Sequence, residues 1–304
     1  MAPRPTSSAA ATASARTMMI FASEVPVISA LNPYRKIEDV FLAVWKRTNP
    51  AQLERLRTEQ ALEAPTPEAR MEAVVRDLGV APAVEALVKE AAAAKTTTTV
   101  AKAQAKIASV LPAATPVAVK QEVVQFVTSE MHKTFGVQHE ATAIEQYQQQ
   151  ERVVVKEKNL VFSKRKLAVV GGHEVFVGGK IDGKVGGKVV EVKNRLRRFI
   201  TPLPPYDVAQ LQTYLFILQA TEGEIVEYLR SDSAATKLTP VVRDDNMWQT
   251  QLSPHIVRFS SALSYLMKDE EAQADFLRAE GDGQREIIRY FWSKDLVLGD
   301  PVAS

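Results

Sequence analysis

The segment GKIDGKVGGKVVEVKNR, at residues 179–195, constrains the fold of this chain more than any other part of it. Its short β-forming runs surround a Gly-Gly pair at 186–187, a combination typical of a turn between two paired strands. Side chains alternate across a strand, so Glu191 and Lys193 share one face. A hairpin here would bring Asp182 close to that same face. The segment therefore predicts three charged side chains on two neighbouring strands.

Charges placed this close together need a physical reason. Two carboxylates held on adjacent strands repel one another unless a cation lies between them. Hard oxygen ligands of this type favour Mg²⁺ or Mn²⁺ rather than zinc. A lysine beside such an ion can orient or deprotonate a water molecule, or stabilise charge that builds up on a phosphate. The alternative interpretation is an exposed ion pair between Glu191 and Lys193, which contributes little to stability.

Polar residues elsewhere in the chain favour the metal interpretation. Glu140, Ile144 and Tyr147 fall on one helical face, so a carboxylate shares an apolar stripe and is expected to point inward. Gln210 and Tyr214 share a later helix face at a spacing of four residues. The Gln210 amide could hold a phosphate or an active-site carboxylate; the alternative is that both side chains simply pack.

Composition excludes several classes of protein. The 304 residues include no cysteine, which rules out disulfides, thiolate zinc sites and iron–sulfur clusters and fits an intracellular protein. No apolar run approaches the roughly 18 residues that span a bilayer, so no membrane segment is expected.

Positive charge is concentrated around the hairpin. Residues 151–200 hold thirteen Lys and Arg against five Asp and Glu, in a chain whose formal net charge is only +2. Arg195, Arg197 and Arg198 follow the hairpin directly, and guanidinium groups beside an aromatic residue suit contacts with a nucleic-acid backbone. The alternative is a solubilising surface. The distribution favours a polyanion as partner.

The chain divides into segments of different periodicity. Residues 20–47 read as helix, turn and helix, with Ser23 as an N-cap, and residues 119–149 as a helix that breaks at Gly136. Short β runs follow over 152–194, then a helix at 206–219 and a strand at 224–230, which together indicate a mixed α/β protein. The expected divisions are a disordered tail (1–15), N-terminal helices (16–47), a helical insertion (48–118), the core (119–250) and C-terminal helices (251–304).

The order of these motifs resembles a known family. The pattern G-x-x-x-E at 136–140, D-G at 182–183, E-V-K at 191–193 and Q-x-x-x-Y at 210–214 is similar to the PD-(D/E)XK nuclease superfamily. More narrowly, the chain looks like the branch of phage lambda exonuclease and the YqaJ-type viral recombination exonucleases. Residues 22–34, ASEVPVISALNPY, resemble the N-terminal helix of that branch. Arg16 stands seven residues before Ser23, as the phosphate-contacting Arg and Ser of the branch do.

The resemblance implies a fold. It implies a restriction-endonuclease-like core, with a mixed, mostly antiparallel central sheet flanked by helices, plus an inserted helical region and C-terminal helices. The resemblance covers the N-terminal helix and roughly residues 119–230. One departure is Ile181, where the family usually has proline before the aspartate. The insertion could buttress the core, arch over DNA or bind a partner.

The resemblance also implies roles for the matched residues. Asp182 and Glu191 would ligate Mg²⁺, for which Mn²⁺ could substitute, with the Val192 carbonyl as a further ligand. Glu140 would complete the metal site directly or through water. Lys193 would position the attacking water.

The remaining matched residues would contact DNA or support the site. Gln210 would steady the site or a phosphate. Arg16 and Ser23 would hold a 5′-terminal phosphate, and Tyr214 is grouped with Arg195, Arg197 and Arg198 as a DNA contact.

These roles predict a Mg²⁺-dependent DNA exonuclease that digests from a 5′ end in recombination, repair or viral genome processing. A structure-specific endonuclease on the same core and a non-catalytic DNA-binding module stay open as alternatives. The implied partners are DNA, a single-strand annealing protein and copies of the chain itself in a ring. The implied location is intracellular, without a named compartment of the host.

Overall fold

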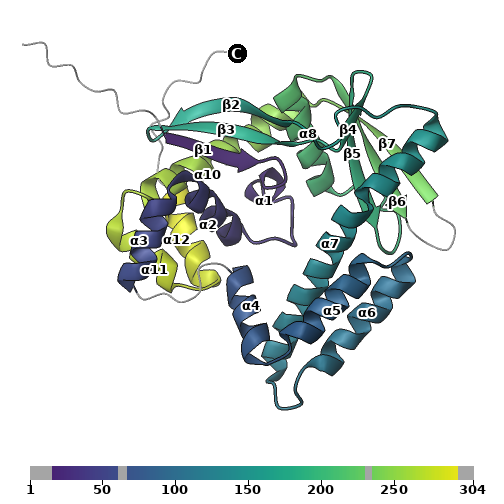
Figure 1. Ribbon diagram of the computed structural model, residues 1–304. Coiled ribbons are helices and arrows are strands. Elements are labelled where there is room, and N and C mark those ends of the chain that lie inside the picture. Colours follow the sequence, from purple (N-terminus) through teal and green to yellow (C-terminus); the bar gives the residue numbers. More distant parts are fainter. Residues whose placement is uncertain (1–15, 61–66, 230–234, 294–304) are drawn as a thin grey trace, which may run out of the picture.

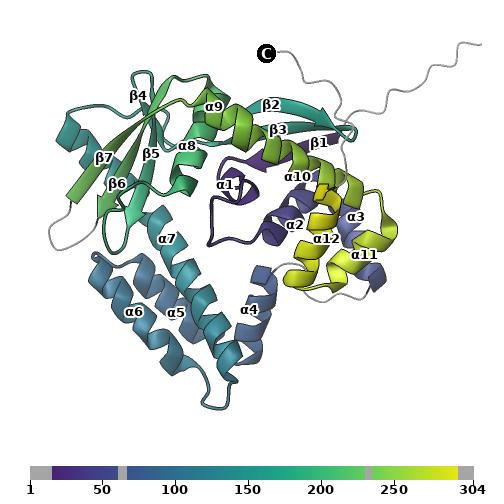
Figure 2. The ribbon, with the colours of Figure 1, turned by 180° about the vertical axis from the view of Figure 1, so that it is seen from behind.

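The computed structural model describes residues 16–60, 67–229 and 235–293, and the predicted tail at 1–15 lies outside this range. Two mixed sheets occupy one side of the molecule and helices surround them (Figures 1 and 2). The elements in chain order are β1 (Arg16–Phe21), α1 (Val25–Ile28), α2 (Ile37–Thr48), α3 (Pro50–Gln60), α4 (Pro67–Asp77), α5 (Ala81–Ala92), α6 (Thr97–Val110), α7 (Val117–Glu151), β2 (Phe162–Val170), β3 (His173–Lys180), β4 (Gly183–Val185), β5 (Lys188–Arg195), α8 (Pro205–Leu218), β6 (Glu222–Leu229), β7 (Ala235–Val242), α9 (Asp245–Met247), the π-helical turn η1 (Trp248–Leu252), α10 (Ser253–Leu266), α11 (Glu270–Arg278) and α12 (Asp282–Ser293).

The predicted mixed α/β class is confirmed, but the strands form two sheets rather than one. The first sheet has the order β1-β3-β2, and the second has the order β4-β5-β6-β7. β1 runs parallel to β3 and β5 parallel to β6, whereas the other pairs are antiparallel. The sheets separate between β3 and β4, where the Asp182 carboxylate accepts the Val192 N–H at 2.7 Å. The Asp182 side chain thus accepts the hydrogen bond that a backbone carbonyl of a neighbouring strand would otherwise accept, and the β4–β5 pairing ends at this point.

The N-terminal segment differs from its predicted helix–turn–helix. Arg16–Phe21 form a strand, because Met18 and Ile20 alternate inward and pair in parallel with β3. Ser23 does not cap a helix and is exposed. The N-cap of the short helix α1 is Glu24, whose carboxylate accepts the Phe21 N–H at 2.8 Å and pairs with Arg47 at 2.6 Å.

The predicted break at Gly136 is wrong, since α7 runs without interruption from Val117 to Glu151. Its predicted apolar stripe is buried throughout: Val123, Val127, Met131 and Phe135. Burial of that stripe outweighs the roughly 1 kcal/mol that one glycine costs inside a helix.

The β region also begins later than predicted. Residues 152–161 form no strand and contribute only an isolated bridge from Lys156 to Lys184. The next strand, β2, is continuous over Phe162–Val170 and has a bulge between Lys166 and Ala168. The bulge shifts the alternation of side chains by one residue, so the sequence of this strand does not show one regular period of two.

The apolar interior consists of a main core and a separate arm. The main core contains α2, α3, α8 and the C-terminal helices, with ring contacts such as Phe41 to Phe259 at 5.3 Å. Helices α4–α6 pack instead on the N-terminal half of α7 around their own apolar residues, and we call these four segments the helical arm. Leu53 and Leu56 of α3 belong to the main core, so the arm begins after α3. None of the helices within the described residues is long and apolar enough to cross a membrane.

Candidate active site

The predicted hairpin at 179–195 is confirmed. β4 and β5 pair with Gly183 opposite Val190 and Val185 opposite Lys188, so the chain turns at the two glycines. Asp182 lies one position before Gly183 and therefore faces Glu191 across the end of the hairpin. The two carboxylates come from neighbouring strands, as the alternation of side chains predicts.

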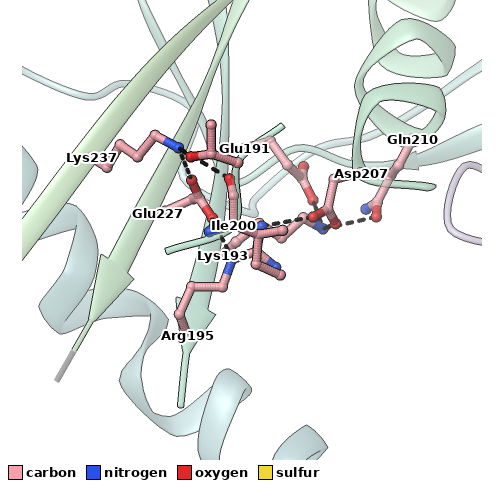
Figure 3. Close-up of polar contacts among 9 residues, drawn as sticks. Glu191, Lys193, Arg195, Ile200, Asp207, Gln210, Glu227 and Lys237 are labelled. Carbon is pink, nitrogen blue, oxygen red and sulfur yellow. Dashed lines mark hydrogen bonds and ion pairs between the residues drawn. The ribbon is translucent and has the colours of Figure 1, made fainter. Parts of the chain in front are cut away.

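Lys193 joins this hairpin to helix α8. Its ammonium donates hydrogen bonds to Glu191 Oε1 and to Gln210 Oε1, both at 2.9 Å (Figure 3). The carboxylate of Asp207, in the first turn of α8, lies 3.4 Å from the same ammonium. Burial alone would lower the pKa of Lys193, but Glu191 and Asp207 outweigh it and raise the pKa above its ordinary value. Lys193 is therefore a fixed positive charge in this state, suited to orienting a water molecule or attracting a phosphate oxygen.

The carboxylates of the hairpin are held in an unfavourable environment. Burial raises the pKa of Asp182 well above its usual range, and the nearby charges of Glu191 and Glu140 raise it further. Burial also raises the pKa of Glu191, against the opposing effect of Lys193. Glu191 Oε2 is buried and has no hydrogen-bond partner among the residues that the structure describes. Burial and then charge repulsion from Glu140 thus raise the pKa of both Asp182 and Glu191, and no hydrogen bond from the described residues stabilises Glu191 Oε2.

The chemistry of these residues fits a small divalent cation. Carboxylate and carbonyl oxygens are the ligands that Mg²⁺ and Mn²⁺ prefer. The Val192 N–H points toward Asp182, and the carbonyl of a strand residue lies on the same side as its N–H. Among these three carboxylates Glu140 is the weakest candidate for a metal ligand, because its carboxylate already accepts a hydrogen bond from Asn159 at 3.2 Å. Within the described residues, no three His, Cys, Asp or Glu side chains form a ready-made metal cage.

Arg195 does not match its predicted role as a phosphate contact. Its guanidinium donates to Glu227 at 2.7 Å and to Asp207 at 2.8 Å, and its side chain is only 11% exposed (Figure 3). Glu227 also accepts the backbone N–H of Ile200 at 3.2 Å. Arg195 therefore neutralises two buried carboxylates rather than facing solvent.

Tyr214 also lies away from solvent, which differs from the predicted DNA contact. It is buried, and its hydroxyl donates to the Lys180 carbonyl at 2.7 Å, which ties α8 to the end of β3. Burial, followed by the charges of Glu191 and Asp182, raises the pKa of Tyr214. Its place beside the carboxylates indicates a supporting residue of the site. Gln210, one turn earlier on α8, does reach the site through Lys193.

Arg16 and Ser23 flank β1. Arg16 is the first residue of the strand and Ser23 follows two residues after its last residue, Phe21, and the strand itself extends about 16 Å at 3.3 Å per residue. Arg16 pairs in register with His173, whereas the Ser23 carbonyl accepts a hydrogen bond from Arg35 at 3.2 Å. Both residues are exposed, and their contact with a 5′-terminal phosphate stays a prediction.

Two functional residues were missed from the sequence. Asp207 reads there as an ordinary acidic residue in a first helical turn, which the helix dipole favours. Glu227 lies in the mostly apolar run EIVEYL of β6. A carboxylate in such a run is expected to be buried and to need a charged partner, and this could have identified Glu227 from the sequence. Together they hold Arg195 and help to hold Lys193.

The repulsion between the carboxylates makes a prediction about stability. The folded protein binds protons at Asp182 more tightly than the unfolded chain, so ionising this carboxyl at neutral pH lowers the free energy of unfolding. Asp182→Asn removes that charge and keeps an acceptor for the Val192 N–H. We expect the variant in EDTA to melt a few degrees higher than the wild type, on the order of 2–5 °C.

A divalent ion should reverse the order of the two melting temperatures, so that the wild type melts higher than Asp182→Asn. Free Mg²⁺ about 100-fold above its Kd stabilises a specific site by about 2.7 kcal/mol, and Asp182→Asn should lose most of that gain. Thermal melts in EDTA, Mg²⁺ and Mn²⁺ measure both effects. Ser163→Ala, at a partly exposed position of β2, is a suitable control. Equal stabilisation of the wild type and Asp182→Asn would contradict a metal site at this residue.

Comparison with known proteins adds little at the level of sequence. No protein-family model matches the chain, and no curated protein matches it. Among solved structures, an alkaline exonuclease from Laribacter hongkongensis is similar at 17% identity over 56% of this chain and 91% of the exonuclease, with a TM-score of 0.37. The same exonuclease in complex with dAMP gives 15% identity, 62% and 90% coverage, and a TM-score of 0.35. Likenesses this distant do not assign residues or activity, so the site itself must carry the function.

Proposed function

We propose that this protein is a divalent-metal-dependent DNA exonuclease that hydrolyses phosphodiester bonds. The observation that carries the proposal is the convergence of Asp182 and Glu191 on one hairpin end, next to an ammonium held by Glu191 and Gln210. Buried carboxylates with raised pKa values and an oxygen atom without a donor are a costly arrangement. Binding of a cation would relieve that cost.

Each residue has a role in the proposed reaction. Asp182, Glu191 and the Val192 carbonyl would hold Mg²⁺ or Mn²⁺, with Glu140 attached directly or through water. When bound, the ion would supply Lewis-acid stabilisation and lower the pKa of a coordinated water. Lys193 would orient that water or stabilise the negative charge that develops on the phosphate.

The supporting residues fix the Lys193 ammonium in place. One of its three N–H groups donates a hydrogen bond to Gln210 and another donates to Glu191. The Asp207 carboxylate, in the first turn of α8, lies 3.4 Å from the same ammonium. An ammonium with its donors committed in this way loses little freedom when the substrate binds, which favours catalysis.

Direction and biological setting are further parts of the proposal. Digestion from a 5′ end, a role in recombination, repair or viral genome processing, a single-strand annealing partner and a ring of copies rest on the family resemblance alone. The contact of Arg16 and Ser23 with a 5′-terminal phosphate also rests on that resemblance. It predicts faster digestion of 5′-phosphate ends than of 5′-hydroxyl ends.

The test uses wild-type protein and linear duplexes labelled at each terminus, with Mg²⁺, Mn²⁺ or EDTA. An exonuclease releases short labelled products from one end, requires the metal, and leaves covalently closed circular DNA intact. Cleavage of the closed circle would instead establish the endonuclease alternative. Binding without cleavage in either metal would overturn the proposed activity and leave a DNA-binding module.

A further inference from the structure

A groove of about 870 Å³ lies beside the candidate active site. Its walls come from the α1–α2 loop, helix α7 and the β5–α8 loop, which surround the middle of the molecule in Figure 1. The residues that give it chemical character are Tyr34, His132, Asn194, Arg197, Arg198 and Tyr206. None of the roles assigned above explains why aromatic rings and free guanidinium groups gather here.

Two tyrosines, Tyr34 exposed and Tyr206 partly exposed, form an aromatic surface in this groove. The Tyr34 and Tyr206 rings lie 5.8 Å apart at an interplanar angle of 84°, an edge-to-face contact. Tyr34 is 79% exposed, although its backbone is fixed by a 2.9 Å hydrogen bond from its N–H to Asn32. A large ring held in water by a fixed backbone offers a flat face to a ligand.

The groove also carries positive charge that the protein does not neutralise. Arg197 and Arg198 are exposed, and neither guanidinium makes an ion pair or hydrogen bond with the described residues. Arg195 is different, because Glu227 and Asp207 engage it fully. His132 of α7 and Arg197 both line the groove, and desolvation followed by the charge of Arg197 lowers the pKa of His132.

The groove is continuous with the candidate catalytic residues. Tyr206 directly precedes Asp207, whose carboxylate lies 3.4 Å from the Lys193 ammonium. Asn194, next to Lys193, lines the groove and donates to the Gly136 carbonyl of α7 at 3.0 Å. A chain bound along the groove would therefore lead toward Lys193.

We propose that this groove binds a single unpaired DNA strand, with one base stacked on the Tyr34–Tyr206 pair and its phosphates on Arg197 and Arg198. Aromatic stacking requires an open base face, and bases inside a duplex have both faces covered by their neighbours. The inference rests on the proposed nuclease function and names its substrate form, a strand whose terminal nucleotides are separated from the complement.

The test measures binding of a fluorescein-labelled oligothymidine by anisotropy in EDTA, with a blunt duplex of equal length as competitor. Tyr34→Ala and Tyr206→Ala should each weaken single-strand binding by about tenfold, within the range for loss of one stacked base. Tyr34→Phe and Tyr206→Phe keep the ring and should stay within roughly twofold of the wild type. Tyr265→Ala, a partly exposed tyrosine on α10 outside the groove, is the matched control.

The arginines and the duplex competitor complete the test. Arg197→Ala and Arg198→Ala should each lower the slope of log K against log salt by about one. Single-strand affinity that is unchanged in both Tyr→Ala variants would overturn the proposal, as would an equal loss for single strand and duplex. If the Tyr→Ala variants weaken single-strand binding while no metal supports cleavage, the proposed nuclease activity is refuted and single-strand binding by the groove is upheld. If cleavage occurs and the Tyr→Ala variants bind the single strand like the wild type, only single-strand binding by the groove is refuted.

Discussion

We expect Lys193→Ala to slow the proposed metal-dependent cleavage of linear DNA by about 10²–10³-fold, the loss typical of removing one pre-organised group that stabilises transition-state charge. The ammonium it removes is fixed by Glu191 and Gln210 and has a raised pKa, so it is positive at every working pH. Asp182→Asn should lose cleavage to a similar or greater extent, because it removes a metal ligand. DNA binding should survive in both variants, since the proposed groove lies outside the Asp182–Glu191 pair.

Single-turnover rates and anisotropy on the same protein samples separate the two effects. Lys193→Gln checks that charge rather than packing is responsible, because the amide can still donate to Glu191 and Gln210. Lys188→Ala is the matched control: this lysine lies on the same strand β5 and pairs with Glu224 at 3.5 Å, away from Lys193. Cleavage at the wild-type rate by Lys193→Gln would show that the positive charge of Lys193 is not used in the mechanism.

Local patterns in the sequence were sufficient for the hairpin and for the apolar stripe of α7. A Gly-Gly turn between β-forming runs fixes which side chains share a face, so Glu191 and Lys193 could be placed together without coordinates. The stripe from Val123 to Phe135 likewise depends only on a helical period. Both features depend on residues close together in the chain.

Features set by distant partners could not be predicted in the same way. Arg16–Phe21 becomes a strand by pairing in parallel with β3, which follows more than 150 residues later. The four-residue apolar run of this segment alone is compatible with either a helix or a strand. The expected N-terminal helices at 16–47 therefore begin later than predicted, with α1 at Val25.

The run of arginines after β5 shows the same limit within the site. Arg195, Arg197 and Arg198 are equivalent in the sequence, yet only Arg195 follows the strand alternation into the interior. Its partner Glu227 lies on β6, which is parallel to β5, and no local pattern joins the two. The structure thereby divides a uniform basic segment into one arginine held by two buried carboxylates, Arg195, and two exposed arginines without such partners among the described residues.

This division predicts that Arg195→Ala destabilises the fold by about 3–5 kcal/mol, the usual cost of leaving a buried charge without its partner. The side chain of Glu227 is 0% exposed and that of Asp207 is 4% exposed, so water cannot replace the guanidinium. Lys237 lies 3.4 Å from Glu227 and can compensate only part of the loss. Urea unfolding at pH 7 measures the effect.

Arg198→Ala, three residues away, is the matched control and should change the free energy of unfolding by no more than about 0.5 kcal/mol, as for an exposed side chain without partners. The double variant Arg195→Ala with Glu227→Gln should be less destabilised than the two single changes together, because it removes a buried charge along with its partner. The two arginines should also differ in DNA binding, since only Arg198 faces the groove freely. An Arg195→Ala protein as stable as the wild type, with weakened and less salt-dependent DNA binding, would show that Arg195 contacts phosphate after all.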